Sequence, residues 1–79
     1  MTNSIVIIPA FNEEKAIGKV IQEIPKTVSE IIVVNNNSTD STGKIAFENG
    51  ATVLTEKRKG YGYACLRGLE YISKQKIKP

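Results

Sequence analysis

The stretch IIVVNNNSTDS, residues 31–41, changes from four consecutive β-branched residues to an unbroken run of polar ones. A continuous apolar run of this kind is typical of a strand that is covered on both faces, as in a parallel sheet. Three asparagines followed by Ser-Thr-Asp-Ser cannot continue such a strand, and they favour a turn. Because ligands of open α/β sheets bind beyond the carboxyl ends of the strands, the sequence predicts a binding site at this loop.

Length and composition limit the class of protein. A chain of 79 residues has room for one domain, and its 41% hydrophobic and 24% charged residues are ordinary for a soluble globular chain. No apolar run approaches the roughly 20 residues that span a bilayer, and the amino terminus lacks the features of a signal peptide, so we expect a cytoplasmic chain. The one cysteine, Cys65, excludes an internal disulfide and is expected in the core. Without histidine, no zinc cluster is expected.

Positive charge is concentrated in the carboxyl-terminal third of the chain. The net charge is +3. From residue 57 onward the sequence contains one acidic residue, Glu70, and the basic residues Lys57, Arg58, Lys59, Arg67, Lys74, Lys76 and Lys78. Such a region is suited to phosphates, nucleic acid or an anionic membrane, although a lysine-rich tail is usually only solvated. We expect no nucleic-acid partner and interpret the tail as a solvated end.

Strand and helix patterns alternate three times along the chain. We expect strands at 4–8, 30–34 and 52–55 and helices at 13–24, 41–48 and 61–74. Alternation of this kind implies parallel strands joined by right-handed crossovers. The predicted fold is a Rossmann-like three-layer α/β sandwich, in which three parallel strands alternate with three helices, as a single partial domain over residues 1–79.

Several residues are expected to set the ends and faces of these elements. Pro9 cannot donate to a sheet ladder and is expected to end the first strand. Asp40 is expected to cap the second helix. In the third helix, Cys65, Leu69 and Ile72 are expected to face the core, and Gly68 to permit close contact with the sheet.

The three polar loops fall at equivalent places in the three repeats, so we expect them to form one shared site. The first, PAFNE, places an aromatic face at Phe11 and a carboxylate at Glu13, which suit a base and a ribose hydroxyl; a core position and a helix-end position explain them equally well. In NNNSTD, a turn explains one or two asparagines but does not require three. In KRKGYG, the basic residues suit a diphosphate, and the glycines allow close backbone approach.

Taken together, PAFNEE, IIVVNNNSTDST and GATVLTEKRKGYGYACLRGL resemble the amino-terminal half of an inverting family 2 glycosyltransferase with the GT-A fold. The similarity is greatest to the dolichyl-phosphate mannose synthase and undecaprenyl-phosphate sugar transferase branch, and it covers almost the whole chain. The resemblance implies a site for a nucleotide-sugar donor. By position it implies donor-binding roles for Pro9, Ala10, Phe11, Glu13, Asn36, Ser38, Lys59, Gly60 and Gly62, and no catalytic residue in this chain.

Two departures from the family pattern affect what the resemblance implies. The usual pair of aspartates is Asn35 and Asn36 here, and a neutral amide fits uracil or thymine better than guanine, so we expect a UDP-sugar. The family's divalent cation, Mg²⁺ or Mn²⁺, is held by an Asp-x-Asp motif, which a chain with the single aspartate Asp40 cannot contain. The family's base and acceptor site lie further along the sequence, so we expect an inactive piece of a larger enzyme.

Other classes of function stay open at this point. The chain is alternatively a stand-alone nucleotide-binding or regulatory module, or an interaction piece that pairs through an uncovered sheet edge, including with itself. A nucleotidyltransferase is the nearest enzymatic rival, but PAFNE lacks the glycine-rich loop expected directly after its first strand. For the parent enzyme, the resemblance suggests a polyprenyl phosphate as acceptor at the cytoplasmic face of a membrane.

Overall fold

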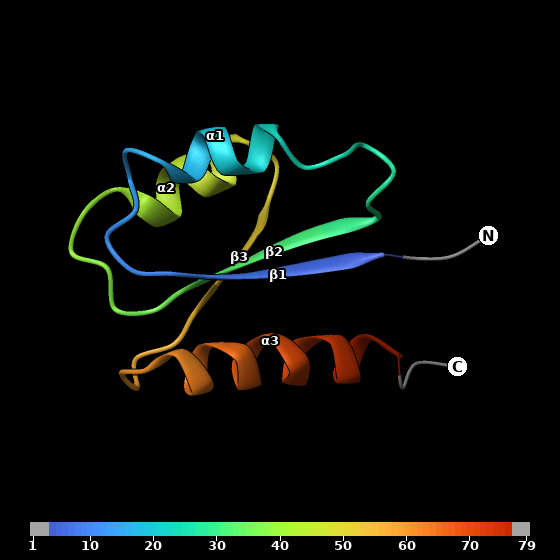
Figure 1. The fold of residues 1–79 in the computed structure, drawn as a ribbon. Helices are drawn as coiled ribbons and strands as arrows, with labels where there is room; N and C mark the ends of the chain where they lie inside the picture. The colour runs from blue at the N-terminus through green and yellow to red at the C-terminus, as the bar shows by residue number, and fades with distance from the viewer. Residues whose placement is uncertain (1–3, 77–79) are drawn as a thin grey trace.

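The computed structural model describes residues 4–76, which form a sheet with helices on both of its faces (Figure 1). Lys78, the last of the basic residues in the lysine-rich carboxyl-terminal tail, lies outside the described residues. In chain order the elements are β1 (Ile5–Ala10), α1 (Ile17–Gln22), β2 (Glu30–Asn35), α2 (Thr42–Glu48), β3 (Thr52–Thr55) and α3 (Tyr61–Lys76).

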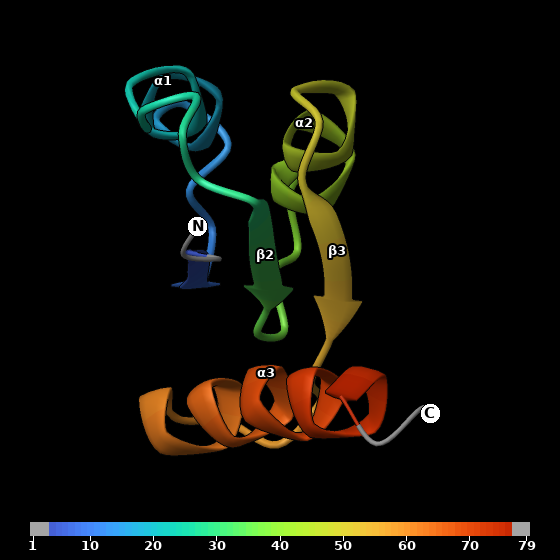
Figure 2. The same cartoon turned by 90° about the vertical axis from the view of Figure 1, so that its right-hand side faces the viewer.

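The three strands are parallel and lie in the order β1-β2-β3. Val33 in the central strand pairs with Ile8 on one side and with Val53 on the other. Helices α1 and α2 cover one face of the sheet and α3 covers the opposite face, which is clear in the two perpendicular views (Figures 1 and 2). The predicted three-layer α/β arrangement is confirmed.

The apolar run of β2 is buried on both faces, as its composition predicts. Successive side chains of a strand point to opposite faces, so Val33 packs beneath α1 and α2 while Ile32 and Val34 face α3. All three are fully buried. The first cluster includes Ile17, Ile21 and Ala46, and the second includes Leu54 and Ala64. The central strand therefore contributes to both hydrophobic clusters, and this packing fixes the position of the polar loop that follows it.

Pro9 does not end the first strand, contrary to expectation, since β1 continues to Ala10 and Pro9 pairs in register with Val34. Alternate residues of a parallel strand present their N–H and C=O groups to the same neighbour. The carbonyl oxygens of Ser4 and Ala10 accept hydrogen bonds from the β2 side. Pro9 therefore turns its missing N–H toward the outer edge of β1, where no strand within residues 4–76 pairs. Sheets tolerate proline at such an edge.

The first helix is shorter than the predicted 13–24, because α1 begins at Ile17 and ends at Gln22. The N–H of Glu13 donates to Oγ1 of Thr42, the first residue of α2, and the N–H of Glu14 donates to the Asp40 carboxylate, so the segment before α1 is tied to the start of α2. The prediction that Asp40 caps α2 is wrong by one residue, because Ser41 occupies the N-cap position; the Asp40 carboxylate nevertheless accepts the N–H of Thr42 at 3.0 Å.

Helix α3 packs on the sheet through small residues. Gly68 is buried, and a Cβ at this position would lie 2.8 Å from Cγ2 of Ile7, which confirms the expected close contact. Leu69 is 57% exposed, so the prediction that it faces the core is wrong; Ala64 and Ile72 face the sheet, and Cys65 is half-buried. The face of α3 that packs on the sheet is thus the one that carries the small residues Ala64 and Gly68, which let the helix approach the strands closely. Within residues 4–76, no helix has the length and apolar character needed to cross a membrane.

Candidate functional site

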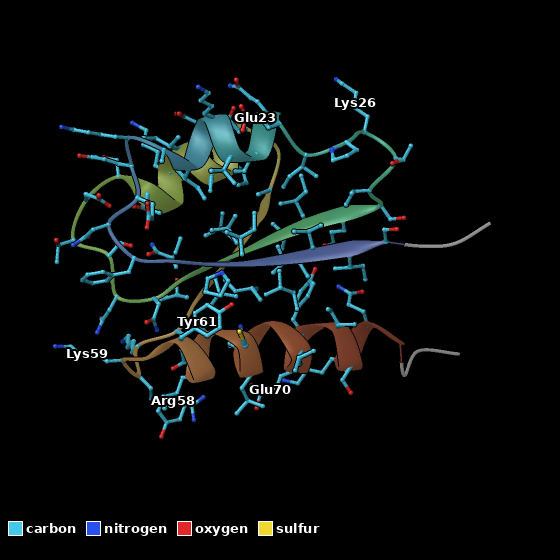
Figure 3. The ribbon with its side chains drawn as sticks, viewed as in Figure 1. Glu23, Lys26, Arg58, Lys59, Tyr61 and Glu70 are labelled. Carbon is cyan, nitrogen blue, oxygen red and sulfur yellow. The ribbon has the colours of Figure 1, made fainter. Side chains whose placement is uncertain are left out.

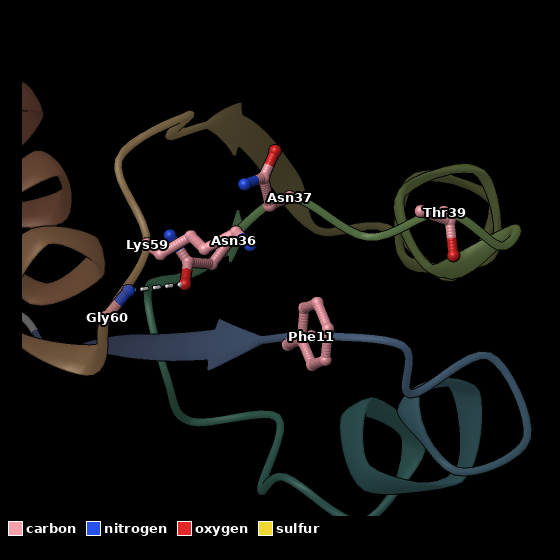
Figure 4. A pocket seen from close by; sticks show the side chains of 6 residues that line it. All are labelled: Phe11, Asn36, Asn37, Thr39, Lys59 and Gly60. Carbon is pink, nitrogen blue, oxygen red and sulfur yellow. Dashed lines mark hydrogen bonds between the residues drawn. The ribbon is translucent and has the colours of Figure 1, made fainter.

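Three loops, one after each strand, meet at the carboxyl edge of the sheet. Between them lies an open pocket of ≈ 580 Å³ (Figure 4). Its lining contains residues from the loops after β1, β2 and β3, namely Phe11, Asn36, Asn37, Thr39, Lys59 and Gly60. The three loops, which are far apart in the sequence, therefore border one pocket.

Other predicted residues lie in two adjoining hollows. One of ≈ 340 Å³ is lined by Pro9, Ala10 and Glu13 together with Phe11 and Asn36, so four of the five residues of the first motif border this hollow. The other, of ≈ 400 Å³, is lined by Gly62 together with Lys59 and Gly60. Ser38 has a different position, because its hydroxyl oxygen accepts the N–H of Asn12 at 2.9 Å and ties two loops together.

The position of Phe11 decides between its two interpretations. The side chain is 56% exposed and borders both the pocket of ≈ 580 Å³ and the adjoining hollow of ≈ 340 Å³. A core phenylalanine would be buried, so the core interpretation is excluded. In Figure 4 the ring stands on the loop after β1 and faces the asparagine loop across the pocket. It presents an aromatic surface of the kind on which a planar ring can stack.

Hydrogen bonds join the loop after β1 to the loop after β2. Besides the bond from Asn12 to Ser38, the N–H of Glu13 donates to Oγ1 of Thr42 at 2.8 Å, and the N–H of Thr39 donates to Oδ1 of Asn12 at 2.8 Å. Thr42 is fully buried. Since an unpaired buried polar group is costly, these contacts fix one loop against the other without any ligand.

Asp40 lies at the centre of the same junction. Its carboxylate accepts hydrogen bonds from the hydroxyl and the N–H of Thr42 and from the N–H of Glu14. The Thr42 hydroxyl is the largest influence, and together these donors lower the pKa of Asp40 below its ordinary value. The single aspartate of the chain therefore has a structural role at the start of α2.

Two asparagines of these loops adopt left-handed backbone conformations, with φ of 51° at Asn12 and 69° at Asn37. Asparagine tolerates this region better than other residues because its short amide can bond locally. Asn37 also donates through Nδ2 to the carbonyl oxygen of Lys57 at 3.2 Å. The asparagine-rich sequence thus serves the geometry of the turn as well as the lining of the pocket.

Asn36 links the loop after β2 to the loop after β3. Its Nδ2 donates to the carbonyl oxygens of Glu56 at 3.2 Å and Arg58 at 2.8 Å, and its Oδ1 accepts the N–H of Gly60 at 3.2 Å. Both amide protons therefore have partners, and one lone pair of Oδ1 remains. The side chain can accept a further hydrogen bond from a ligand but cannot donate one.

In the basic loop after β3, Arg58 is paired within the protein, whereas Lys59 borders the pocket. The guanidinium of Arg58 donates from Nε and from a terminal nitrogen to the two carboxylate oxygens of Glu56, each at 2.9 Å, and lies 4.5 Å from the ring centroid of Tyr63. Arg58 is thus held by Glu56, whereas Lys59 extends outward from the loop (Figure 3) and borders the pocket. Of the two, only Lys59 is placed to meet a phosphate there.

Asn37, Thr39 and Tyr61 line the pocket or the ≈ 340 Å³ hollow although the sequence did not single them out, and Tyr63 and Leu66 of α3 likewise line the ≈ 400 Å³ hollow. The first two belong to the asparagine loop already expected to form the site, and Tyr61 lies between the two glycines of the third loop. Their loops were predictable, but which side chains turn inward depends on the loop conformations. Within residues 4–76, no group of three or more His, Cys, Asp or Glu side chains is placed to hold a metal ion.

Sequence comparison relates the chain to known proteins. The model of the family described as glycosyl transferase family 2 matches residues 5–77. The protein RfbJ of Shigella flexneri is 48% identical over 62 residues, covering 76% of this chain and 48% of RfbJ. The low-salt glycan biosynthesis hexosyltransferase Agl6 of Haloferax volcanii is 39% identical over 72 residues, covering 85% of this chain and 17% of Agl6. The chain thus spans less than half of the relatives it matches.

Solved structures give the same relationship. Glucosyl-3-phosphoglycerate synthase of Mycobacterium tuberculosis, solved with Mn²⁺, UDP-glucose and glycerol 3-phosphate, superposes with a TM-score of 0.79 at 34% sequence identity, covering 87% of this chain and 29% of the synthase. The same enzyme with UDP and Mn²⁺ gives a TM-score of 0.76. The chain therefore belongs to glycosyl transferase family 2 and corresponds to the amino-terminal part of its GT-A fold.

Proposed function

We propose that this chain provides the donor-nucleotide part of a glycosyltransferase site, and that the pocket between the three loops binds the uridine diphosphate portion of a sugar nucleotide. The observation that carries the proposal is the convergence of Phe11, Asn36 and Lys59 on one pocket from three separate loops. An aromatic ring, an amide and an ammonium suit a base, its polar edge and a phosphate, respectively. The solved synthase that contains UDP-glucose supports the choice of donor class.

Each residue has a distinct role in this proposal. Phe11 is exposed enough to stack with the base. Lys59 supplies a positive charge for the diphosphate. Arg58 does not contribute to this charge, because its guanidinium is paired with Glu56. Pro9, Ala10 and Glu13 border the adjoining hollow and shape the ribose side of the site. Gly60 and Gly62 allow the backbone at the start of α3 to come close to the donor.

The free lone pair of Asn36 supports a preference for uracil. Uracil presents a single N3–H, which one acceptor satisfies, whereas guanine presents paired N–H donors that a carboxylate suits better. The direct test is equilibrium binding of UDP and GDP to the chain and to the longer parent protein, with and without Mn²⁺. Tighter binding of UDP is expected, and tighter binding of GDP would refute the base preference.

The parent enzyme is proposed to transfer the sugar with inversion and to use a divalent cation held outside residues 4–76. The described residues do not fit a metal, so no step through a metal is assigned to them. We expect the 79-residue chain alone to transfer no sugar. A radiolabelled donor assay checks this expectation, and measurable transfer by the purified chain would contradict it.

The acceptor remains a prediction. The family resemblance suggests a polyprenyl phosphate, while the solved synthase was crystallised with glycerol 3-phosphate. Both carry a phosphate, and we propose a phosphate-bearing acceptor for the parent enzyme. Assays of the parent with a polyprenyl phosphate and with glycerol 3-phosphate separate the two, and transfer only to an acceptor without phosphate would overturn the proposal.

Two rival functions are distinguished by measurements on the chain itself. A stand-alone nucleotide-binding module binds UDP at micromolar strength without metal, whereas a donor half binds weakly. An interaction piece pairs through the outer edge of β1, but Pro9 removes a donor from that edge. Sedimentation that shows a stable monomer at high concentration excludes pairing of the chain with itself through this edge.

A further inference from the structure

Asn36 has an unusual set of contacts for a residue at the rim of a pocket. It is only 9% exposed, and its hydrogen bonds reach residues 20 to 24 positions later in the chain. Figure 4 shows the bond that joins its Oδ1 to the backbone N–H of Gly60. The side chain is thus built into the loop after β3 rather than directed freely into the pocket.

The partners determine which way the amide is oriented. Two carbonyl oxygens, those of Glu56 and Arg58, require donors, and the N–H of Gly60 requires an acceptor. The opposite orientation would place Oδ1 against both carbonyl oxygens. An ionised carboxylate at this position, which has no proton to donate, would face the same two oxygens. The amide is therefore a chemical requirement of the loop as it is folded here.

The bonds to Asn36 lie on both sides of Lys59. The carbonyl oxygen of the preceding residue, Arg58, and the N–H of the following residue, Gly60, are both held. Gly60 has a φ of 123°, a conformation that side-chain-bearing residues rarely adopt, so the turn held by Asn36 requires glycine at this position. The backbone of Lys59 is fixed relative to the central strand before any ligand arrives.

We propose that Asn36 is a positioning residue whose amide holds Lys59 and Gly60 in the conformation that receives the diphosphate of the donor. The proposal rests on the proposed function for its ligand, but the positioning itself is a property of the unliganded chain. It also predicts that this protein cannot use an aspartate at position 36, the residue that its family resemblance leads one to expect there.

The first test uses the unmodified chain. Proton exchange with solvent is measured by NMR for the side-chain amides of Asn36 and Asn37, which are adjacent and border the same pocket. We expect the Asn36 amide to exchange at least about fivefold more slowly, because both of its protons are bonded and nearly buried. Equal exchange rates for the two side chains would overturn the proposal, and this result does not depend on any variant folding.

The second test compares Asn36→Asp with Asn37→Asp. Both variants add one negative charge to the same pocket, but Asn37 is exposed and donates a single bond, to Lys57. We expect N36D to lose the exchange protection of the Gly60 N–H and to bind UDP at least about tenfold more weakly than N37D does. Unchanged protection at Gly60 and unchanged UDP affinity in N36D would contradict the positioning role.

The pH dependence of N36D separates positioning from a general loss of structure. A carboxyl that faces two carbonyl oxygens titrates above the ordinary value of about 3.9, and once protonated it donates one of the lost bonds. UDP affinity and Gly60 protection in N36D should recover as the pH falls, with a midpoint above that of N37D. Absence of recovery, or identical midpoints, counts against the proposal. If the unmodified chain does not bind UDP, the proposed function fails while the exchange measurements still decide the positioning.

Discussion

The two carboxylate oxygens of Glu56 each accept a hydrogen bond of 2.9 Å from the guanidinium of Arg58, two residues later. The backbone N–H of Arg58 also donates to Glu56, at 2.8 Å. The Glu56 side chain is almost fully buried, whereas that of Arg58 is half exposed. The hydrogen bonds between Glu56 and Arg58 stabilise the segment between β3 and α3. The hydrogen bonds of Asn36 attach the same segment to the end of β2.

The pair predicts a loss of stability in acid. The Arg58 side chain, followed by its backbone N–H, lowers the pKa of Glu56 from 4.5 to about 2. A carboxyl whose pKa is lower in the folded state stabilises the fold above pH 4.5 and loses that contribution as the pH falls toward 2. Urea unfolding at pH 6, 4 and 3 should show a declining free energy of unfolding.

The variant Glu56→Gln provides the control for this prediction. It should be less stable at pH 6 and show a shallower decline toward pH 3. Some decline should persist, because the pKa of Asp40 is also lowered in the fold. An E56Q variant with the same acid profile as the unmodified chain would show that the pair does not contribute.

Gly68 predicts a steric effect at the contact between α3 and the sheet. In Gly68→Ala the new Cβ would lie 2.8 Å from Cγ2 of Ile7, and overpacking of this kind costs about 1–3 kcal/mol. The helix propensity of alanine offsets about 1 kcal/mol of that cost. Gly62→Ala is the matched control in the same helix, because nothing lies within 4 Å of its added Cβ. Chemical unfolding should rank G68A below G62A, and the reverse order would disprove the close contact.

The fold was predictable from sequence wherever the pattern alone decides it. The run of β-branched residues around Val33 identified the central strand, and the alternation of strand and helix patterns identified the layers. The extension of β1 through Pro9 was not predictable, because it depends on β1 lying at an edge of the sheet. The late start of α1 was also not predictable, and the Glu13 and Glu14 N–H groups that precede it bond to residues 29 and 26 positions away, which no local pattern reveals.

The site was predictable at the level of loops but not of side-chain roles. Parallel topology brought Phe11, Asn36 and Lys59 to one edge, and the structure places them in one pocket. Sequence could not show that Arg58 is held by Glu56 or that Asn36 bonds three backbone groups, because these contacts depend on the conformation of the loop after β3. Polar residues in such loops either stabilise the loop or contact a ligand, and the three-dimensional structure is needed to tell which.

Thr42 predicts a coupling between the first two loops. Thr42→Val keeps the shape of the side chain but removes the acceptor of the Glu13 N–H and a donor to Asp40. A lower free energy of unfolding is expected, because the Glu13 N–H and the Asp40 carboxylate each lose a partly buried hydrogen-bond partner. The pKa of Asp40 should also rise, since the Thr42 hydroxyl is the largest cause of its lowering. Thr42→Ser retains the hydroxyl, so an Asp40 pKa that rises equally in both variants would contradict the assignment.

Phe11 predicts an effect on binding without an effect on stability. Stacking of a base on an aromatic side chain contributes about 1–3 kcal/mol, so Phe11→Ala should weaken UDP binding roughly fivefold or more. Its side chain is 56% exposed, so the free energy of unfolding should change little. Phe47, which is 71% exposed on α2 and does not line the pocket, provides the control. Equal effects of F11A and F47A on UDP affinity would remove Phe11 from the site.

The most direct measurement is a residue-by-residue NMR titration of the 79-residue chain with UDP, which detects binding even in the millimolar range. We predict saturable shifts concentrated at Phe11, Asn37, Lys59 and Gly60, four of the residues that line the pocket, which together represent all three loops. Saturable shifts confined to one loop, shifts located elsewhere on the surface, or no saturable shift at all would contradict the assignment of this pocket as the nucleotide site.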